Sequence, residues 1–370
     1  MIIKKLNLTN FRNYDNLEIE FNKKINIIYG NNAQGKTNIL EGIFVLCLTK
    51  SHRLYVDSNL IKHNQEFTNL IGIFENKPID DVKKLSIDNS GKKLELNNNR
   101  VKKINDYIIN SNIIIFYPED LNLIKGSPQE RRRYLNVELS QLYNNYIIYL
   151  NDYNKLLKMR NDYLKKIKFN ENVDLNYFSI LTNYLIQRSV SIYEIRKKYF
   201  EDLNKIIGDI YYEISGYKDF KLIYKPSVNL DSNDVQKTML EEFKKRYNDE
   251  VRLGTTVIGP HKDDYYFTLD DNNLKENGSQ GQQRMSIIAY KLAEISLFKN
   301  IKGEKPILLL DDVFSELDDI KKNLLLKYID DDFQVIITTT DLKNINENIL
   351  KKAKLIKIRD GKIEEVQNGE

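Results

Sequence analysis

A segment near the N-terminus has the residues and spacing of a phosphate-binding loop. Residues 30–37 match the pattern G-x-x-x-x-G-K-S/T, and they follow the continuous apolar run 25–29. Glycines let the backbone wrap closely around a phosphate, and the N–H groups at a helix N-terminus then point at the anion. The spacing therefore predicts a nucleoside triphosphate site between a strand and a helix. The residues expected to bind ATP are Gly30, Asn31, Asn32, Ala33, Gln34, Gly35, Lys36 and Thr37.

A pair of carboxylates far along the chain complements this loop. The apolar run 307–310 ends in Asp311 and Asp312. A buried strand of a parallel sheet delivers its C-terminal residues to the crevice where ligands bind. We therefore expect Asp311 and Thr37 to hold Mg²⁺. Asp312 is predicted to be the catalytic base that orients the attacking water, with Lys36 contacting the β- and γ-phosphates.

A third motif, residues 279–282, reads Ser-Gln-Gly-Gln directly before an apolar helical pattern. It resembles the S-G-G-Q signature of ABC proteins, with Gln280 in place of the first glycine. Taken alone, it predicts only a capped helix. A serine hydroxyl and glycine amides at a helix start also form an anion site, which in ABC proteins faces the γ-phosphate bound to the opposite subunit. On that basis Ser279, Gly281 and Gln282 are predicted to bind nucleotide.

The elements that must position these motifs differ between the ends and the middle of the chain. Short alternating or apolar runs at both ends predict strands, and further strands are expected at 220–226, 255–260 and 265–270. A helix start at Ser127 precedes two apolar stripes over 135–167 and 178–210, with a polar turn between them. Two such stripes predict an antiparallel helical hairpin, similar to a short coiled coil. The alternative is an ordinary helical subdomain that does not project as an arm.

Lys36 and Asp311 lie 275 positions apart (311 − 36), so a large insert must separate two halves of one site. We therefore predict an α/β fold: an ABC-type P-loop ATPase head whose sheet is built from both chain ends, with an inserted helical, coiled-coil-like subdomain. The expected parts are 1–126 with the phosphate loop, 127–250 as the helical subdomain, and 251–370 with the signature motif and the acidic strand.

Composition narrows the class of protein. Hydrophobic residues make up 41% and charged residues 30%, which is typical of a globular protein. The single cysteine, the lack of a long apolar run and an N-terminus unlike a secretory signal predict a cytoplasmic protein. The net charge of +4 permits binding to nucleic acid without demonstrating it. The DNA-contact candidates, each equally explained by a structural ion pair, are Arg131, Arg132, Arg133 and Lys262.

Eight sequence blocks in order resemble the RecF family over nearly the whole chain. They are residues 10–14, the phosphate loop, 51–53, 118–121, 125–133, 259–264, 279–284, and 309–312 with the D-loop-like 315–318. The resemblance implies an ATP- and Mg²⁺-dependent homodimer that binds double-stranded and single-strand/double-strand junction DNA without sequence preference. It also implies RecR and RecO as partners, assistance to RecA loading, and no association with a membrane.

Two positions depart from the general ABC pattern. Asp312 replaces the usual catalytic glutamate, and Thr340 stands where ABC proteins carry a histidine. Both changes predict slow ATP hydrolysis, because phosphoryl transfer depends mainly on positioning. Residues 116–120 occupy the approximate place of the ABC Q-loop. The alternatives are the ATPase subunit of a transporter, a nuclease joined to an ATPase, and a DNA-binding protein that does not hydrolyse ATP.

Overall fold

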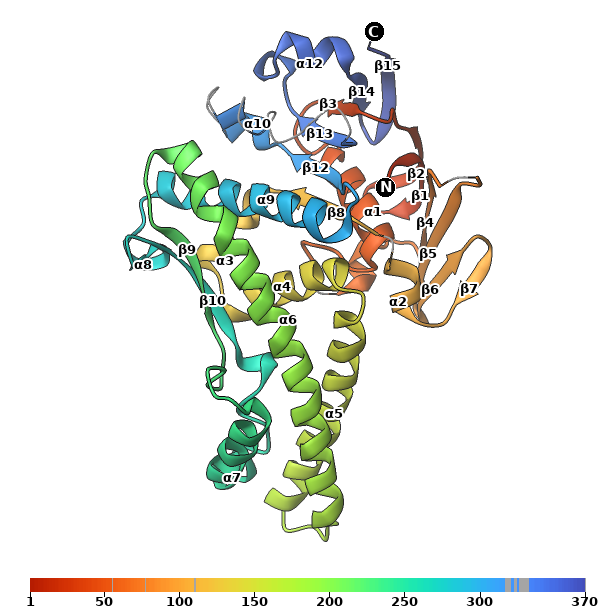
Figure 1. Cartoon of the computed structure of the whole chain (residues 1–370). Helices are drawn as coiled ribbons and strands as arrows, with labels where there is room; N and C mark the ends of the chain where they lie inside the picture. Colours follow the sequence, from red (N-terminus) through yellow and green to blue (C-terminus); the bar gives the residue numbers. More distant parts are fainter. Residues whose placement is uncertain are drawn as a thin grey trace. The chain divides into compact units, whose positions relative to one another are not determined.

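The computed structural model covers the chain and describes residues 1–54, 56–76, 78–109, 111–316, 321–322, 325 and 333–369 (Figure 1). Two compact units are formed. The first combines residues 1–120 with 290–370, and the second contains residues 121–289. No helix among these described residues is long and apolar enough to cross a membrane.

A six-stranded sheet of the first unit contains segments from both ends of the chain. Its strand order is β15-β14-β3-β13-β12-β8, and every neighbouring pair is parallel except β14 with β15. The strands are β3 (Ile25–Tyr29), β8 (Ile113–Phe116), β12 (Ile307–Asp311), β13 (Val335–Thr339), β14 (Lys354–Arg359) and β15 (Lys362–Gln367). The predicted sheet shared between the chain ends is thus confirmed.

The second sheet of this unit is antiparallel, in the order β2-β1-β4-β5-β6-β7. Its strands alternate buried and exposed side chains, as their sequences predict. Asp88 pairs with Gly91, so Asn89 and Ser90 form the turn of a β-hairpin. The strands are β1 (Ile3–Phe11), β2 (Tyr14–Glu20), β4 (Phe67–Phe74), β5 (Asp81–Asp88), β6 (Gly91–Leu96) and β7 (Asn99–Val101).

Short helices and one long buried helix complete the first unit. Helix α1 (Lys36–Leu48) follows the phosphate loop and is buried from Ile39 to Leu48. The other elements are η1 (Asp57–Leu60), α2 (Ile104–Ile108), η2 (Pro118–Leu121), α10 (Val313–Glu316), η4 (Leu342–Asn344) and α12 (Glu347–Lys352). Helix α9 (Gln280–Lys302) begins in the second unit and ends in the first.

The second unit contains the predicted helical hairpin, formed by α5 and α6 (Figure 1). A capping box starts α4, because the Ser127 N–H donates to a Glu130 carboxylate oxygen at 2.7 Å and the Glu130 N–H donates to the Ser127 hydroxyl. The helices are α3 (Asn122–Lys125), α4 (Pro128–Leu142), α5 (Tyr146–Lys168), α6 (Leu175–Ser215), α7 (Val235–Leu253) and α8 (Leu274–Asn277).

A buried ion pair explains why Arg160 interrupts the apolar stripe of α5. Its guanidinium donates to Glu250 at 2.6 Å and to the Thr256 hydroxyl at 2.8 Å. The strand predicted over 255–260 is wrong. The Thr256 N–H donates to the Asn161 side chain and the Val257 N–H to Glu250, so side chains rather than a neighbouring strand satisfy this backbone.

A three-stranded sheet pairs residues 264–269 with a strand of the helical unit. Strand β10 pairs antiparallel with β9, from Asp264 opposite Lys225 to Leu269 opposite Phe220. This pairing is why the second unit extends to residue 289, whereas the sequence-based division placed a boundary after 250. The strands are β9 (Phe220–Lys225), β10 (Asp264–Leu269) and β11 (Asn272–Asn273), and η3 (Pro260–Lys262) precedes β10.

A buried lysine joins two segments of the first unit where the chain passes between units. The Lys291 ammonium donates to the Ile115 carbonyl at 2.7 Å and lies 3.1 Å from the Asp120 carboxylate and 4.0 Å from that of Glu294. All three charged side chains are almost fully buried. Burial raises the pKa of Asp120 to about 6, and the Lys291 ammonium acts in the opposite direction.

We predict that Lys291→Met will be strongly destabilising at pH 7, because two buried carboxylates lose their cation. The free energy of unfolding, measured with urea, should fall by about 3–5 kcal/mol. The Asp120 pKa, already above its unfolded value, should rise further. A carboxyl raised in this way costs stability as pH increases, so the loss should be smaller at pH 5 than at pH 7.

The double variant Lys291→Met, Asp120→Leu is the control, since it removes the ammonium together with Asp120, the nearer of the two carboxylates. Its free energy of unfolding should lie much closer to that of the parent. Equal urea midpoints for Lys291→Met and the parent at pH 7 would contradict this account.

Candidate nucleotide-binding site

The phosphate loop connects β3 to α1 and adopts backbone conformations that require glycine at two positions. Gly30 has φ +149°, and a Cβ there would overlap the Ile358 carbonyl oxygen. Gly35 has φ +102°, and a Cβ there would lie 2.6 Å from the Asn13 amide nitrogen. Ile358 and Asn13 therefore pack closely against the backbone of the loop, and only glycine fits at these two positions.

Lys36 lies across this loop. Its ammonium donates to the carbonyl oxygens of Gly30 and Asn31, both at 2.7 Å. Burial lowers the pKa of Lys36, while the charges of Asp312 and Asp311 oppose the shift. A cation held by the loop carbonyls at the start of a helix is placed to receive a phosphate group.

The Asp311 carboxylate joins the loop to the acidic strand end. The Thr37 hydroxyl donates to Asp311 Oδ1 at 2.8 Å, and the Thr338 hydroxyl donates to the same oxygen at 2.6 Å. Burial raises the pKa of Asp311, and these two hydrogen bonds lower it. Thr37 and Asp311, predicted to share Mg²⁺, are thus in direct contact although 274 positions separate them.

Asp312 turns away from the strand. It has φ +52°, and its N–H donates to the Thr338 carbonyl at 3.2 Å and to the Thr338 hydroxyl at 3.1 Å. This left-handed conformation ends β12 and leaves Asp312 at the edge of a cavity. The cavity has a volume of about 230 Å³ and is lined by residues 32–38, Arg53, Asp311, Asp312, Thr338 and Thr340.

Arg53 reaches this cavity from a segment that is held by a buried carboxylate. Glu41 accepts the Arg12 guanidinium at 2.7 Å and the Ser51 hydroxyl at 2.5 Å. The Ser51 oxygen in turn accepts the backbone N–H groups of Arg53 and Leu54, each at 3.0 Å. This chain of contacts fixes the turn that presents Arg53, whose charge lowers the pKa of Asp311 against the effect of burial.

The residues present fit a magnesium nucleotide. The loop supplies glycine-enabled backbone and a lysine for phosphates, while Thr37 and Asp311 supply the hard oxygen ligands that Mg²⁺ prefers. Among the residues that the structure describes, no group of three or more His, Cys, Asp or Glu side chains could hold a metal. A magnesium ion here would therefore take most of its ligands from phosphate and water, as is usual for this ion.

The signature motif lies at the exposed start of α9 in the second unit. The Ser279 N–H donates to the Gln282 side chain at 2.9 Å, and the Gln282 N–H donates to the Ser279 hydroxyl at 3.2 Å. These bonds form a helix cap. Ser279, Gln280 and Gly281 are exposed, and a Cβ at Gly281 would touch nothing closer than 4.0 Å.

One of the DNA-contact candidates is corrected by the structure. Arg131 is buried, and its guanidinium makes two bonds to the Asp264 carboxylate, at 2.7 and 2.8 Å, so its donors are used inside the protein. Arg132 donates to the Asp263 carbonyl at 2.8 Å and is half-buried, as is Arg133. Lys262 is exposed.

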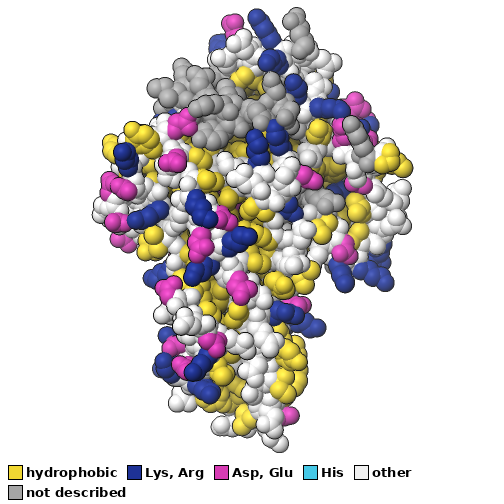
Figure 2. All heavy atoms as spheres, viewed as in Figure 1, with side chains coloured by type: hydrophobic (Ala, Val, Ile, Leu, Met, Phe, Trp, Pro, Cys, Tyr) yellow, Lys and Arg dark blue, Asp and Glu magenta, His cyan; other side chains and the backbone are white. Residues whose placement is uncertain are grey.

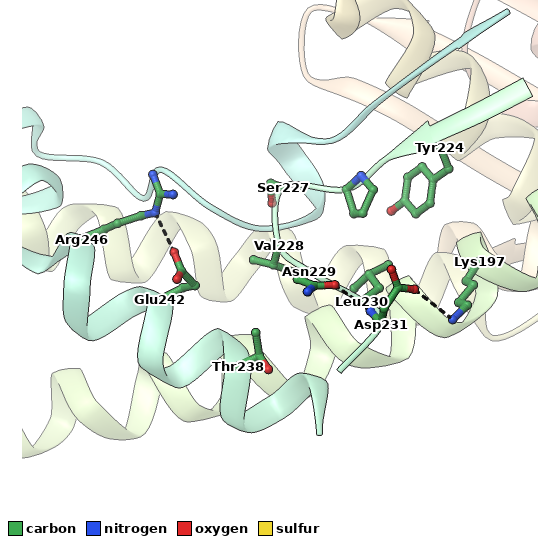
Figure 3. A pocket seen from close by; sticks show the side chains of 11 residues that line it. Lys197, Tyr224, Ser227, Val228, Asn229, Leu230, Asp231, Thr238, Glu242 and Arg246 are labelled. Atoms are coloured by element: carbon green, nitrogen blue, oxygen red, sulfur yellow. Dashed lines mark hydrogen bonds and ion pairs between the residues drawn. The ribbon is translucent and has the colours of Figure 1, made fainter. Parts of the chain in front are cut away.

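A larger cavity of about 550 Å³ lies in the second unit, beside α7 and residues 226–231 (Figure 3). Each of the two basic side chains that line it has a carboxylate partner: Lys197 lies 3.9 Å from Asp231, and Arg246 lies 3.2 Å from Glu242. Its lining contains no glycine loop, so it does not resemble the phosphate site.

Two residues of the site were missed from the sequence. Arg53 was noted only as part of the matching block 51–53, and Thr338 was not singled out. The position of Thr338 at the carboxyl end of a parallel strand was a usable signal. No local pattern placed Arg53 there. Of the D-loop-like segment, Leu317 and Asp318 lie outside the described residues, as do the side chains of Ser315 and Glu316.

Comparison with known proteins agrees with this geometry. Residues 2–364 match the family described as the RecF/RecN/SMC N terminal domain. The chain is 39% identical to the DNA replication and repair protein RecF of Bacillus mycoides (strain KBAB4) and 40% identical to that of Bacillus cereus (strain G9842). Each alignment covers 98% of this chain and 98% of the relative.

Solved structures of RecF and of an Smc head are similar to this chain. The recombination mediator protein RecF with ATP, in the RecFOR pathway, superimposes with a TM-score of 0.91 at 31% identity, covering 99% of this chain and 97% of that one. An Smc head, at 17% identity and a TM-score of 0.54, shares the fold. A phosphate loop and an acidic strand end joined in this sheet define an ATP-binding ABC-type ATPase with an SMC-like head. The chain belongs to the RecF family.

We predict that Thr338→Val will weaken magnesium-dependent ATP binding about tenfold, since Asp311 loses a hydrogen bond to its charged form. The Asp311 pKa, raised already, should rise further. The protonated carboxyl is a poor Mg²⁺ ligand, so the affinity defect should grow as pH falls from 7 to 5. Titration with a fluorescent ATP analogue, with Mg²⁺ and with EDTA, measures both effects.

Thr339→Val is the matched control. Thr339 is equally buried, but its hydroxyl donates to the Asp341 carbonyl instead of to Asp311. If both variants lose magnesium-dependent affinity to the same extent, the specific role given to Thr338 is wrong.

Proposed function

We propose that the protein is an ATP-gated clamp on DNA. Each of two copies binds ATP with Mg²⁺ on its phosphate loop. Ser279, Gly281 and Gln282 of one copy then contact the ATP that is bound to the other copy. The shared γ-phosphate then joins the subunits, and hydrolysis separates them. The cavity lined by residues 32–38, Asp311 and Asp312 supports the nucleotide-binding and catalytic roles proposed for the phosphate loop and for these two aspartates.

The observation that carries this proposal is the surroundings of Gly281. Glycine in a helix costs about 1 kcal/mol relative to alanine. Gly281 is exposed, and its own chain leaves open space around it, so internal packing gives no reason for glycine there. Close approach of a ligand to the backbone is such a reason. A nucleotide held by a second copy is that ligand in this proposal.

The proposed hydrolysis is slow and stimulated by DNA. Asp312 is one methylene shorter than glutamate, and Thr340 lines the cavity in place of a histidine. Both weaken the positioning of the attacking water and of the γ-phosphate, on which phosphoryl transfer depends. Slow hydrolysis would keep the two copies joined on DNA for longer.

We further propose that the clamp recognises gapped or single-strand/double-strand junction DNA in the cytoplasm and assists RecA loading together with RecR and RecO. Relatives 39–40% identical over nearly their full length are DNA replication and repair proteins, and one similar structure belongs to the RecFOR pathway. Phosphate contacts would make the affinity independent of sequence and sensitive to salt. Nothing in these relatives supports the transporter alternative.

We predict that Gly281→Ala will raise the free energy of unfolding by a few tenths to about 1 kcal/mol, yet abolish ATP-dependent dimerisation. Ser279→Ala should also prevent dimerisation while leaving ATP binding to the monomer nearly intact. Analytical ultracentrifugation with a non-cleavable ATP analogue measures the dimer, and thermal unfolding measures the stability.

Lys36→Ala is the negative control, because it should lose ATP binding itself. Normal dimerisation of both Ser279→Ala and Gly281→Ala would refute the contact between signature motif and nucleotide.

We also predict that Asp312→Asn will dimerise with ATP but release phosphate at least a hundredfold more slowly, since an amide cannot accept the proton of the attacking water. Asp341→Asn is the control: this neighbouring carboxylate is exposed and does not line the cavity. Phosphate release in the presence of gapped DNA is the measurement. A parental rate for Asp312→Asn would exclude Asp312 as the base.

A further inference from the structure

Exposed apolar side chains are concentrated on the α5–α6 hairpin. Among the described residues fifteen large hydrophobic side chains are exposed, and six of them lie between residues 148 and 184. Figure 2 shows hydrophobic side chains gathered at the lower end of the view, where Figure 1 shows the end of this hairpin. These six, which are 37–71% exposed, are Ile148, Phe169, Leu175, Tyr177, Ile180 and Tyr184. Such a concentration on a surface indicates a binding site.

Aromatic side chains of the two helices meet on this hairpin. Tyr177, Ile180 and Tyr184 follow one another at helical spacing and are exposed, whereas Phe178 and Leu181 are buried. The Tyr177 ring meets the half-buried Tyr163 ring of α5, with 5.3 Å between the ring centres. We call Tyr149, Tyr163, Tyr177, Ile180 and Tyr184 the tyrosine stripe.

Cations lie on the rings at both ends of the tyrosine stripe. The Lys166 ammonium is 5.7 Å from the centre of the Tyr163 ring, and the Arg188 guanidinium is 5.7 Å from the centre of the Tyr149 ring. Two neighbouring carboxylates are already paired: Asp152 lies 3.1 Å from Arg188, and Asp162 lies 3.7 Å from Lys165. Aromatic rings and cations therefore lie together on this hairpin.

Exposed lysines and amides occur along both helices of the hairpin, and one of them, Lys166, contacts the stripe directly. On α5 these lysines are Lys155, Lys158, Lys165, Lys166 and Lys168. On the outer side of α6, Asn176, Asn183 and Gln187 are exposed. This combination has the two parts of a single-stranded nucleic-acid site, namely aromatic rings on which bases stack and cations that follow the phosphates.

We propose that the tyrosine stripe binds single-stranded DNA, with bases stacked on Tyr163, Tyr177 and Tyr184 and phosphates held by Lys155 and Lys166. The inference rests on the proposed DNA-binding function and adds a second contact to it, on the hairpin. A duplex hides the faces of its bases and would use only the lysines, so the aromatic residues select the single strand. A protein partner is the competing occupant, and the density of lysines favours the nucleic acid.

The chain contains no tryptophan, which makes a direct test feasible. Tyr184→Trp introduces a unique indole into the stripe of the full-length protein. Base stacking should quench its fluorescence when oligothymidylate is added, whereas a duplex of the same length should cause little quenching.

Tyr212→Trp is the matched control. Tyr212 lies on the same helix, is 50% exposed, and has the Lys218 ammonium 5.6 Å from its ring centre, but it is outside the stripe. Its fluorescence should not respond to oligothymidylate. Equal quenching at both positions, or equal quenching of Tyr184→Trp by duplex, overturns the assignment to single-stranded DNA.

Alanine variants test the contribution to affinity. Tyr177→Ala and Tyr184→Ala should each weaken oligothymidylate binding, measured by fluorescence anisotropy, about tenfold, the factor of one stacked base. Tyr212→Ala should bind as the parent does. Binding of a gapped duplex by the parent tests the DNA function separately. If the parent binds it and Tyr184→Ala retains full affinity for oligothymidylate, the stripe is not the site; if the parent binds neither DNA, the proposed function itself fails.

Discussion

The site depends on the parallel pairing of β13 between β3 and β12. This pairing places Asp311 beside Thr338 and brings Tyr29, the residue before the phosphate loop, opposite Thr339. The strand ends that carry the chemistry therefore meet at one edge of the sheet, although β3 lies far from β12 and β13 in the chain. Without this register Thr37 could not donate to Asp311.

At that edge of the sheet, backbone conformation shapes the nucleotide site as much as the side chains do. Gly30 and Gly35 take up positive φ values where a side chain would collide with Ile358 and Asn13. Asp312 also has a positive φ, which ends the strand and redirects the chain along the cavity. At Gly281, by contrast, a side chain would meet no neighbouring atom closer than 4.0 Å. Constraint by the fold accounts for the first two glycines, whereas packing within the chain does not account for Gly281.

Buried ion pairs connect segments within the unit that contains this site and within the helical unit. Lys291 lies between Asp120 and Glu294, Arg160 is paired with Glu250, and Arg131 with Asp264. Because a buried charge without a partner is costly, each pair fixes the relative position of two segments within its own unit. The same pairing removes Arg131 from the cations available to DNA, while the exposed lysines of α5 remain accessible.

The sequence by itself determined the phosphate loop, the acidic strand end, the sheet shared by both chain ends and the helical hairpin, because glycine spacing and apolar periodicity are local signals. Only the tertiary structure decided that residues 255–260 are not a strand, and that Arg53 and Thr338 join the site. It also decided that Arg131 is internal. These outcomes depend on partners distant in the chain, such as Asn161 for Thr256 and Asp264 for Arg131, which no local pattern contains.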